Sequence, residues 1–147
     1  MNGYKYLYKI ESFDNYDGDS FNLTMDIGFN LVIHRACRLF GADTPEMKDK
    51  RPDWRAAAEL AQSEAELFIA DGVADGTAYF ESEHYAGKYG RPLGNIVWLG
   101  VNGQPIDNLR DMLMRARLAV VYYGENKSEI ESEHQANIDY LKSVGKI

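Results

Sequence analysis

The chain has few of the features that mark secreted or membrane proteins. It contains one cysteine in 147 residues, so no disulfide can form within it. Its longest uninterrupted apolar run, residues 118–123, is six residues long, far short of the ~20 that cross a bilayer. The first residues, MNGYKYLYKIE, lack the apolar stretch of a secretory signal. We therefore expect a cytoplasmic protein with no membrane association.

Positive charge is also scarce. The chain has 16 Lys and Arg against 23 Asp and Glu, which gives a net charge of −7. A protein that holds nucleic acid mainly through charge needs an excess of Lys and Arg, so the acidic balance argues against a broad, charge-driven nucleic-acid binder. Hydrophobic residues make up 45% of the chain, which is enough for a core. The length predicts one domain covering residues 1–147.

The first third of the chain alternates apolar and polar residues. The alternation covers residues 4–12, 21–27 and 31–39, and a period of two is typical of β-strands. Turn-forming residues are dense between the first two segments and recur at 28–30. The pattern predicts a three-stranded meander.

The rest of the chain mixes helices and strands. Helical patterns cover residues 54–70, 108–117 and 128–142, with Gly72 and Gly76 expected to break the first. Strand patterns cover 77–83 and 93–101, and Asn102-Gly103 predicts a type I′ turn. Three strands, a helix, two strands and further helices is the order of an OB-fold. We expect an α+β protein with a five-stranded barrel and about three helices.

Three short clusters contain the residue types that catalysis and metal binding require. They are residues 17–20 (DGDS), 38–46 (RLFGADTPE) and 88–91 (KYGR). Each also has a structural interpretation, as a hairpin turn, a strand end with a polar turn, and an exposed loop. Arg38 has the opposite strand parity to Cys37 and Leu39, so its side chain should point away from the core and toward a groove.

Taken together, the clusters supply the carboxylates Asp19, Asp43 and Glu46 and the arginines Arg38 and Arg91. Phosphodiester hydrolysis needs a cation, a positioned water and positive groups on the charge that develops at phosphorus. Carboxylate ligands favour Ca²⁺ or Mg²⁺ over zinc. His34 and Cys37 have no second ligand pair, which argues against a zinc site, and His84 and His134 are expected to be exposed.

These clusters resemble motifs of the staphylococcal nuclease family. DGDS resembles that family's DGDT, RLFGADTPE resembles RLxGIDTPE, and KYGR matches its KYGR loop. The blocks occur in the same order at similar separations, and residues 118–123 resemble the strand after the family's second helix. The resemblance covers about residues 4–142. The segment between Asp19 and Arg38 is several residues longer than usual, so its hairpin should project further.

The resemblance implies a Ca²⁺-dependent endonuclease that cleaves RNA and DNA, preferring single-stranded or unwound DNA, and leaves 3′-phosphates. It also implies a role for each matched residue. The Ca²⁺ ligands would be Asp19, Asp43 and the backbone carbonyl of Thr44. Glu46 would hold the attacking water, and Arg38 and Arg91 would clamp the scissile phosphate. Further substrate contacts would come from three residues: Lys88 and Tyr89 at a terminal phosphate, and Tyr123 as a base-stacking platform.

Two other interpretations remain open. In the first, the domain has the OB-fold but little or no turnover, and it binds nucleic acid as a module. In the second, a protein partner docks on the predicted helix at 54–70, because residues 59–83 hold seven acidic residues and no Lys or Arg. No obligate partner is evident from the sequence. The set of three carboxylates beside two arginines favours the nuclease, because a module that only binds phosphates has no need of the carboxylates.

Overall fold

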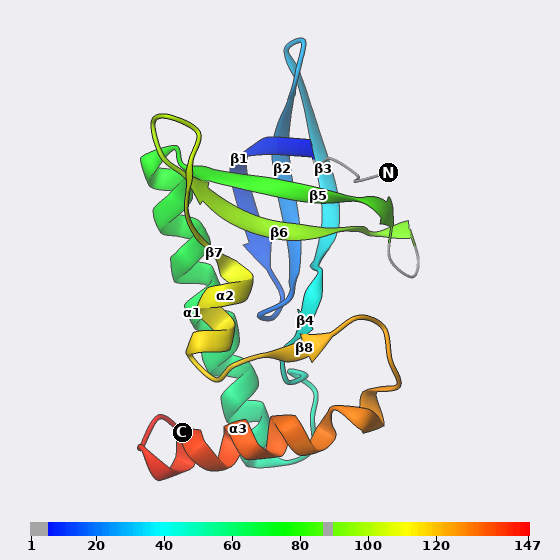
Figure 1. Ribbon diagram of the computed structural model, residues 1–147, viewed down its shortest axis with the longest axis vertical. Helices are drawn as coiled ribbons and strands as arrows, with labels where there is room; N and C mark the ends of the chain where they lie inside the picture. The colour runs from blue at the N-terminus through cyan, green and yellow to red at the C-terminus, as the bar shows by residue number, and fades with distance from the viewer. Residues whose placement is uncertain (1–5, 87–89) are drawn as a thin grey trace.

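The computed structural model describes residues 6–86 and 90–147, with the backbone alone at 84–86 (Figure 1). The strands are β1 (Tyr6–Asn15), β2 (Ser20–Gly28), β3 (Leu31–Leu39), β4 (Gly41–Asp43), β5 (Ala78–Ala86), β6 (Pro92–Leu99), β7 (Pro105–Asn108) and β8 (Val120–Tyr122). The helices are α1 (Pro52–Asp75), α2 (Leu109–Arg115) and α3 (Glu131–Ser143), with a 3-10 turn η2 (Lys127–Glu129).

Five strands close into a barrel, as the sequence predicted. The strand order is β3-β2-β1-β5-β6, with antiparallel neighbours, and a short parallel pairing between β3 and β6 closes the ring. The result is an OB-fold-like barrel with three helices. β7 extends the sheet beside β6, and β4 pairs with β8 in a separate two-stranded ladder.

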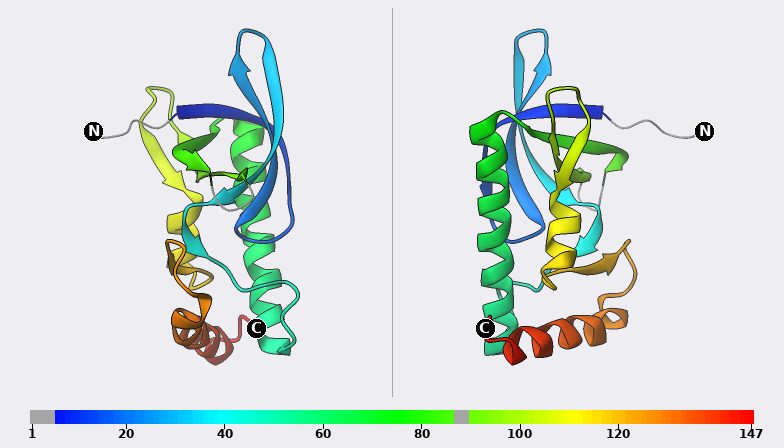
Figure 2. Two further views of the ribbon diagram at one scale, coloured as in Figure 1. Left: turned by 90° about the vertical axis from the view of Figure 1, so that its right-hand side faces the viewer. Right: turned by 60° about the vertical axis from the view of Figure 1, so that its left-hand side comes forward.

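The core fills the barrel and the space between the barrel and the helices. Alternate residues of the strands point inward, among them Ile10, Leu23 and Phe80, each at most 2% exposed. α1 runs along one side of the barrel and α3 crosses the end of α1, with β4 and β8 between α3 and the barrel (Figure 2). The buried face of α1 consists largely of alanines, including Ala61, and small side chains let a helix approach a strand turn closely.

α1 extends to Asp75, five residues past the predicted end, because Gly72 does not break it. Gly72 lies inside the helix, where an added Cβ would come within 2.4 Å of Trp98 Nε1. The glycine therefore permits close packing between helix and barrel. The helix ends at Gly76, whose φ of +73° is a left-handed cap.

The type I′ turn lies in a different hairpin from the one predicted. At Asn102-Gly103 only the glycine has a positive φ, so that turn is not type I′. Phe29 and Asn30 have φ values of 56° and 59° and join Gly28 to Leu31, which is the type I′ geometry. The β2–β3 hairpin that they close projects beyond the barrel, as its length predicted (Figure 1).

The short strands β4 and β7 were not predicted, since three or four residues give too little alternation to detect. In the described part of the chain, no helix combines the length and apolar character that crossing a membrane requires.

Candidate active site

The seam where the barrel closes brings the sequence clusters together. Arg38 on β3 pairs with Ser20 on β2 and with Leu93 on β6. Asp19 directly precedes Ser20, and its carbonyl accepts a hydrogen bond from the Leu39 amide at 2.9 Å. Segments about 20 and 55 residues apart in sequence therefore meet at one end of the barrel.

Asp19 is 1% exposed and held by a dense set of contacts. Its Oδ2 accepts hydrogen bonds from the Thr44 amide at 3.0 Å and from Arg38 Nη2 at 3.4 Å, and its Oδ1 accepts from the Ser20 hydroxyl at 3.3 Å. The preceding Gly18 makes this approach possible, because a Cβ there would lie 2.8 Å from Thr44 Cγ2. The glycine brings the turn against the strand end that carries Asp43 and Thr44.

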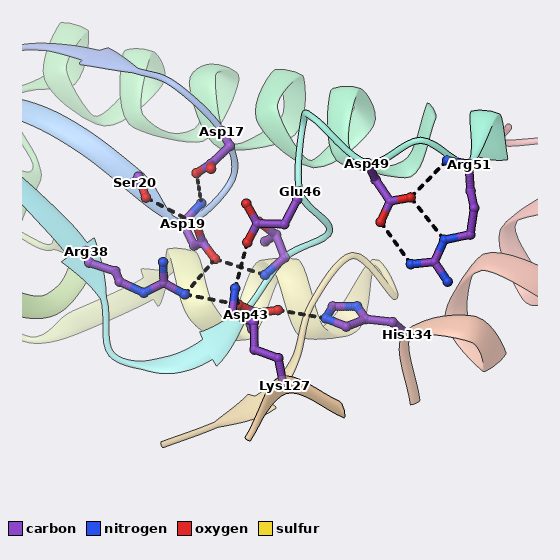
Figure 3. Close-up of polar contacts among 11 residues, drawn as sticks. Asp17, Asp19, Ser20, Arg38, Asp43, Glu46, Asp49, Arg51, Lys127 and His134 are labelled. Carbon is purple, nitrogen blue, oxygen red and sulfur yellow. Dashed lines mark hydrogen bonds and ion pairs between the residues drawn. The ribbon is translucent and has the colours of Figure 1, made fainter. Parts of the chain in front are cut away.

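Arg38 links the two predicted metal-binding carboxylates (Figure 3). Its Nη2 lies 3.0 Å from Asp43 Oδ1 as well as 3.4 Å from Asp19 Oδ2. Burial alone would lower the pKa of Arg38, but the charges of Asp19 and Asp43 outweigh it and raise the pKa. The side chain is 19% exposed, and it points away from the core as its strand parity predicted.

A pocket of about 390 Å³ opens beside Arg38. Its ionisable lining residues are Asp17, Arg38, Glu46 and Arg91. The pocket is therefore lined by all three of the predicted catalytic side chains, Arg38, Glu46 and Arg91. The pocket is large enough for a phosphate group, and the two arginines line it together with the carboxylate of Glu46.

Asp17 is the most perturbed acid of the site. Burial, followed by the charge of neighbouring Asp19, raises its pKa from an ordinary 3.8 to about 8. It is 6% exposed, and its Oδ1 accepts a hydrogen bond from the Asp19 amide at 3.1 Å. Burial and the neighbouring carboxylate therefore favour the protonated form of Asp17 at neutral pH.

Two residues that contact the site were missed by the sequence analysis, and both come from the C-terminal segment. Lys127 Nζ lies 3.1 Å from Asp43 Oδ1 and 2.6 Å from Glu46 Oε1. His134 Nε2 lies 2.9 Å from Asp43 Oδ2. The expectation that His134 is exposed was wrong, because it is 4% exposed and packs against the Trp54 ring at 5.7 Å between centroids.

These contacts determine the charge state of Asp43. Burial alone would raise the pKa of Asp43, but hydrogen bonds from His134 and Lys127 outweigh burial and lower it. Asp43 is therefore an ionised acceptor, and His134 Nε2 donates to it. No local motif signals this pair, since His134 and Asp43 are 91 positions apart.

The oxygen donors predicted to bind a cation lie close to one another. Across residues 6–86 and 90–147, no three or more His, Cys, Asp or Glu side chains form a metal-binding group. The predicted set is smaller, namely two carboxylates with the Thr44 backbone. Asp19 and Asp43 are both buried and converge on the same arginine nitrogen. Thr44 Oγ1 is buried without a hydrogen-bond partner among the described residues. Oxygen donors alone suit Ca²⁺ or Mg²⁺.

The predicted substrate contacts are less complete. Tyr123 follows β8, is 63% exposed and packs edge-on against Phe40 at 5.3 Å between ring centroids. An exposed ring held by a second ring suits base stacking. Lys88 and Tyr89 lie outside the described residues.

No protein-family model matches this sequence, and no curated protein matches it. What this chain shares with known proteins therefore rests on the quoted motifs and on the barrel.

Proposed function

We propose that this protein is a Ca²⁺-dependent nuclease that hydrolyses phosphodiester bonds of RNA and of single-stranded or unwound DNA, leaving 3′-phosphates. The observation that carries the proposal is the shared pocket of Arg38, Glu46 and Arg91 beside the buried pair Asp19 and Asp43. The residues come from three separated segments. Their meeting at the barrel seam supports the proposal, because the reaction needs these groups in one place.

Each residue has a part in that reaction. Asp19, Asp43 and the Thr44 carbonyl would hold the cation, which when bound polarises a phosphoryl oxygen. Arg38 and Arg91 offer forked donors to the charge that builds on phosphorus, and they accelerate the reaction only if they bind the transition state better than the diester. Glu46 is 54% exposed at its side chain, so it can orient a water from the pocket as a base or an acceptor.

A second function is favoured by one observation. Lys127 and Arg38 already pair with Asp43, and His134 is hydrogen-bonded to it, so the carboxylate has polar partners without a cation. In that case the domain is an OB-fold module that binds nucleic acid or a protein partner without significant turnover. The third carboxylate, Glu46 at the pocket edge, weighs against this alternative.

The test is cleavage of denatured DNA at low ionic strength, first with Ca²⁺ and then with excess EGTA. The Arg38→Ala protein, purified in parallel, controls for contaminating nuclease. Cleavage that needs both Ca²⁺ and Arg38 supports the proposal. Folded protein that binds the strand and leaves it intact would favour the binding module.

A further inference from the structure

The segment between β8 and α3 delivers a positive charge into the carboxylate site. Lys127 is the first residue of η2, and the Asn126 side chain caps that turn by accepting a hydrogen bond from the Ser128 amide at 3.1 Å. The turn aims the Lys127 side chain at the strand end that carries Asp43 (Figure 3). A lysine in a capped turn is held in position by its backbone.

Lys127 makes its contacts with two residues that have separate roles. Its ammonium is 3.1 Å from Asp43 Oδ1, on a predicted cation ligand, and 2.6 Å from Glu46 Oε1, on the predicted water-holding carboxylate. Burial alone would lower the pKa of Lys127, but these two carboxylates outweigh it and raise the pKa. The ammonium therefore stays charged at neutral pH and joins the two carboxylates.

Lys127 contacts a carboxylate oxygen of Asp43 that a divalent cation at this site would also need. Asp43 Oδ1 is shared by Lys127 and Arg38, and Asp43 Oδ2 is taken by His134. An ammonium is a compact point charge with three donors, and it takes the oxygen that a cation on Asp43 would need. Lys127 is 48% exposed and His134 is 5% exposed at the side chain, so Lys127 is the partner that can withdraw into water.

We propose that Lys127 is a resident counter-ion that competes with the divalent cation for Asp43, so that cation binding requires Lys127 to leave. This inference rests on the proposed function, because it concerns the same cation. It gives the C-terminal segment a role in setting how much Ca²⁺ the site needs. It also explains why the carboxylates form a balanced network with Lys127 in place.

The experiment is calorimetric titration of Ca²⁺ into the full-length protein without nucleic acid. Lys127→Met removes the ammonium and keeps the length of the side chain. Lys142→Met is the matched control, since Lys142 pairs with Asp53 at 3.4 Å, and Asp53 is not one of the residues assigned to the site. We expect Lys127→Met to bind Ca²⁺ about tenfold more tightly than wild type, and Lys142→Met to match wild type. Lys127→Gln is the second variant if Lys127→Met does not fold.

The outcomes separate the inference from the proposed function. If Lys127→Met binds Ca²⁺ with wild-type or weaker affinity, the competition is overturned and the nuclease proposal stands. If wild type and both Lys127 variants fold but bind no Ca²⁺ at millimolar concentration, both are overturned. If Lys127 is only structural, Lys127→Met should lower the thermal stability of the protein without tightening Ca²⁺ binding.

Discussion

The site has two halves that differ in how they are built. The barrel half consists of Asp19, Arg38 and Asp43, which lie on or beside strands that the barrel seam holds in register. The C-terminal half consists of Lys127 and His134, which come from a short turn and a helix that packs beyond β4 and β8. The barrel half contains groups proposed to bind the cation and the phosphate. The C-terminal half supplies the ammonium of Lys127 and a hydrogen bond from His134, and both contact Asp43.

We expect mutations to separate the proposed reaction from its structural support within this one network. Asp43 belongs to both halves, because it bonds to Arg38 on one side and to Lys127 and His134 on the other. Changes in the barrel half should remove chemistry while leaving the fold. Changes in the C-terminal half should alter stability and cation affinity while leaving the chemistry.

The largest effect on cation-dependent cleavage is expected for Asp19→Asn. The change keeps the shape of the side chain and removes the charge that a cation needs, so cleavage at a fixed Ca²⁺ concentration should fall by about 100-fold or more. A Ca²⁺ titration of cleavage measures this. Asp14→Asn, an exposed carboxylate on β1, is the control. Unchanged Ca²⁺ dependence in Asp19→Asn would remove Asp19 from the site.

His134→Phe tests the C-terminal half. The ring against Trp54 is retained and the hydrogen bond to Asp43 is lost, which should lower the free energy of unfolding by about 2 kcal/mol. Urea denaturation measures the change, with Tyr140→Phe on the same helix as the control, expected within about 0.5 kcal/mol of wild type. Cleavage at saturating Ca²⁺ should stay within a few-fold. A loss of cleavage as large as that of Asp19→Asn would end the distinction between the halves.

Asp17 should make stability depend on pH. Between about pH 4 and pH 8 the native protein holds a proton on Asp17 that the unfolded chain has released, so stability falls as pH rises, by about 1.4 kcal/mol per pH unit at the steepest. Asp17→Asn should flatten this dependence and stabilise the protein at pH 8. Thermal unfolding from pH 4 to pH 8 measures it, and an equal slope in both proteins would contradict the assignment.

The smallest effect is expected for Tyr123→Ala. Tyr123 is exposed and touches substrate only by stacking in this account, so affinity for single-stranded DNA should weaken by about fivefold, at the low end for one stacked base. Fluorescence anisotropy measures the affinity, and Tyr140→Ala provides an exposed tyrosine elsewhere as the control. Equal affinities of the two variants would exclude Tyr123 as a platform.

The same division explains what could be predicted from the sequence. The barrel followed from alternation, and Arg38, Asp43 and Glu46 could be identified because they lie within nine residues of one another in a recognisable block. Lys127 and His134 could not, because their partners are more than 80 positions away and become neighbours only when α3 packs. Gly72 was misjudged for a related reason, since its contact with Trp98 is a tertiary one.

The central claim is that the barrel half performs phosphodiester hydrolysis, and Arg38→Ala tests it most directly. The measurement is the single-turnover cleavage rate of a single-stranded oligonucleotide at saturating Ca²⁺, with its Kd measured beside it and Arg55→Ala on α1 as the control. The hydrogen bonds from Arg38 to the phosphate should strengthen in the transition state. In Arg38→Ala the cleavage rate should therefore fall by about 100-fold to 1,000-fold, while Kd changes by less than about tenfold. A rate equal to that of wild type in Arg38→Ala would contradict the account.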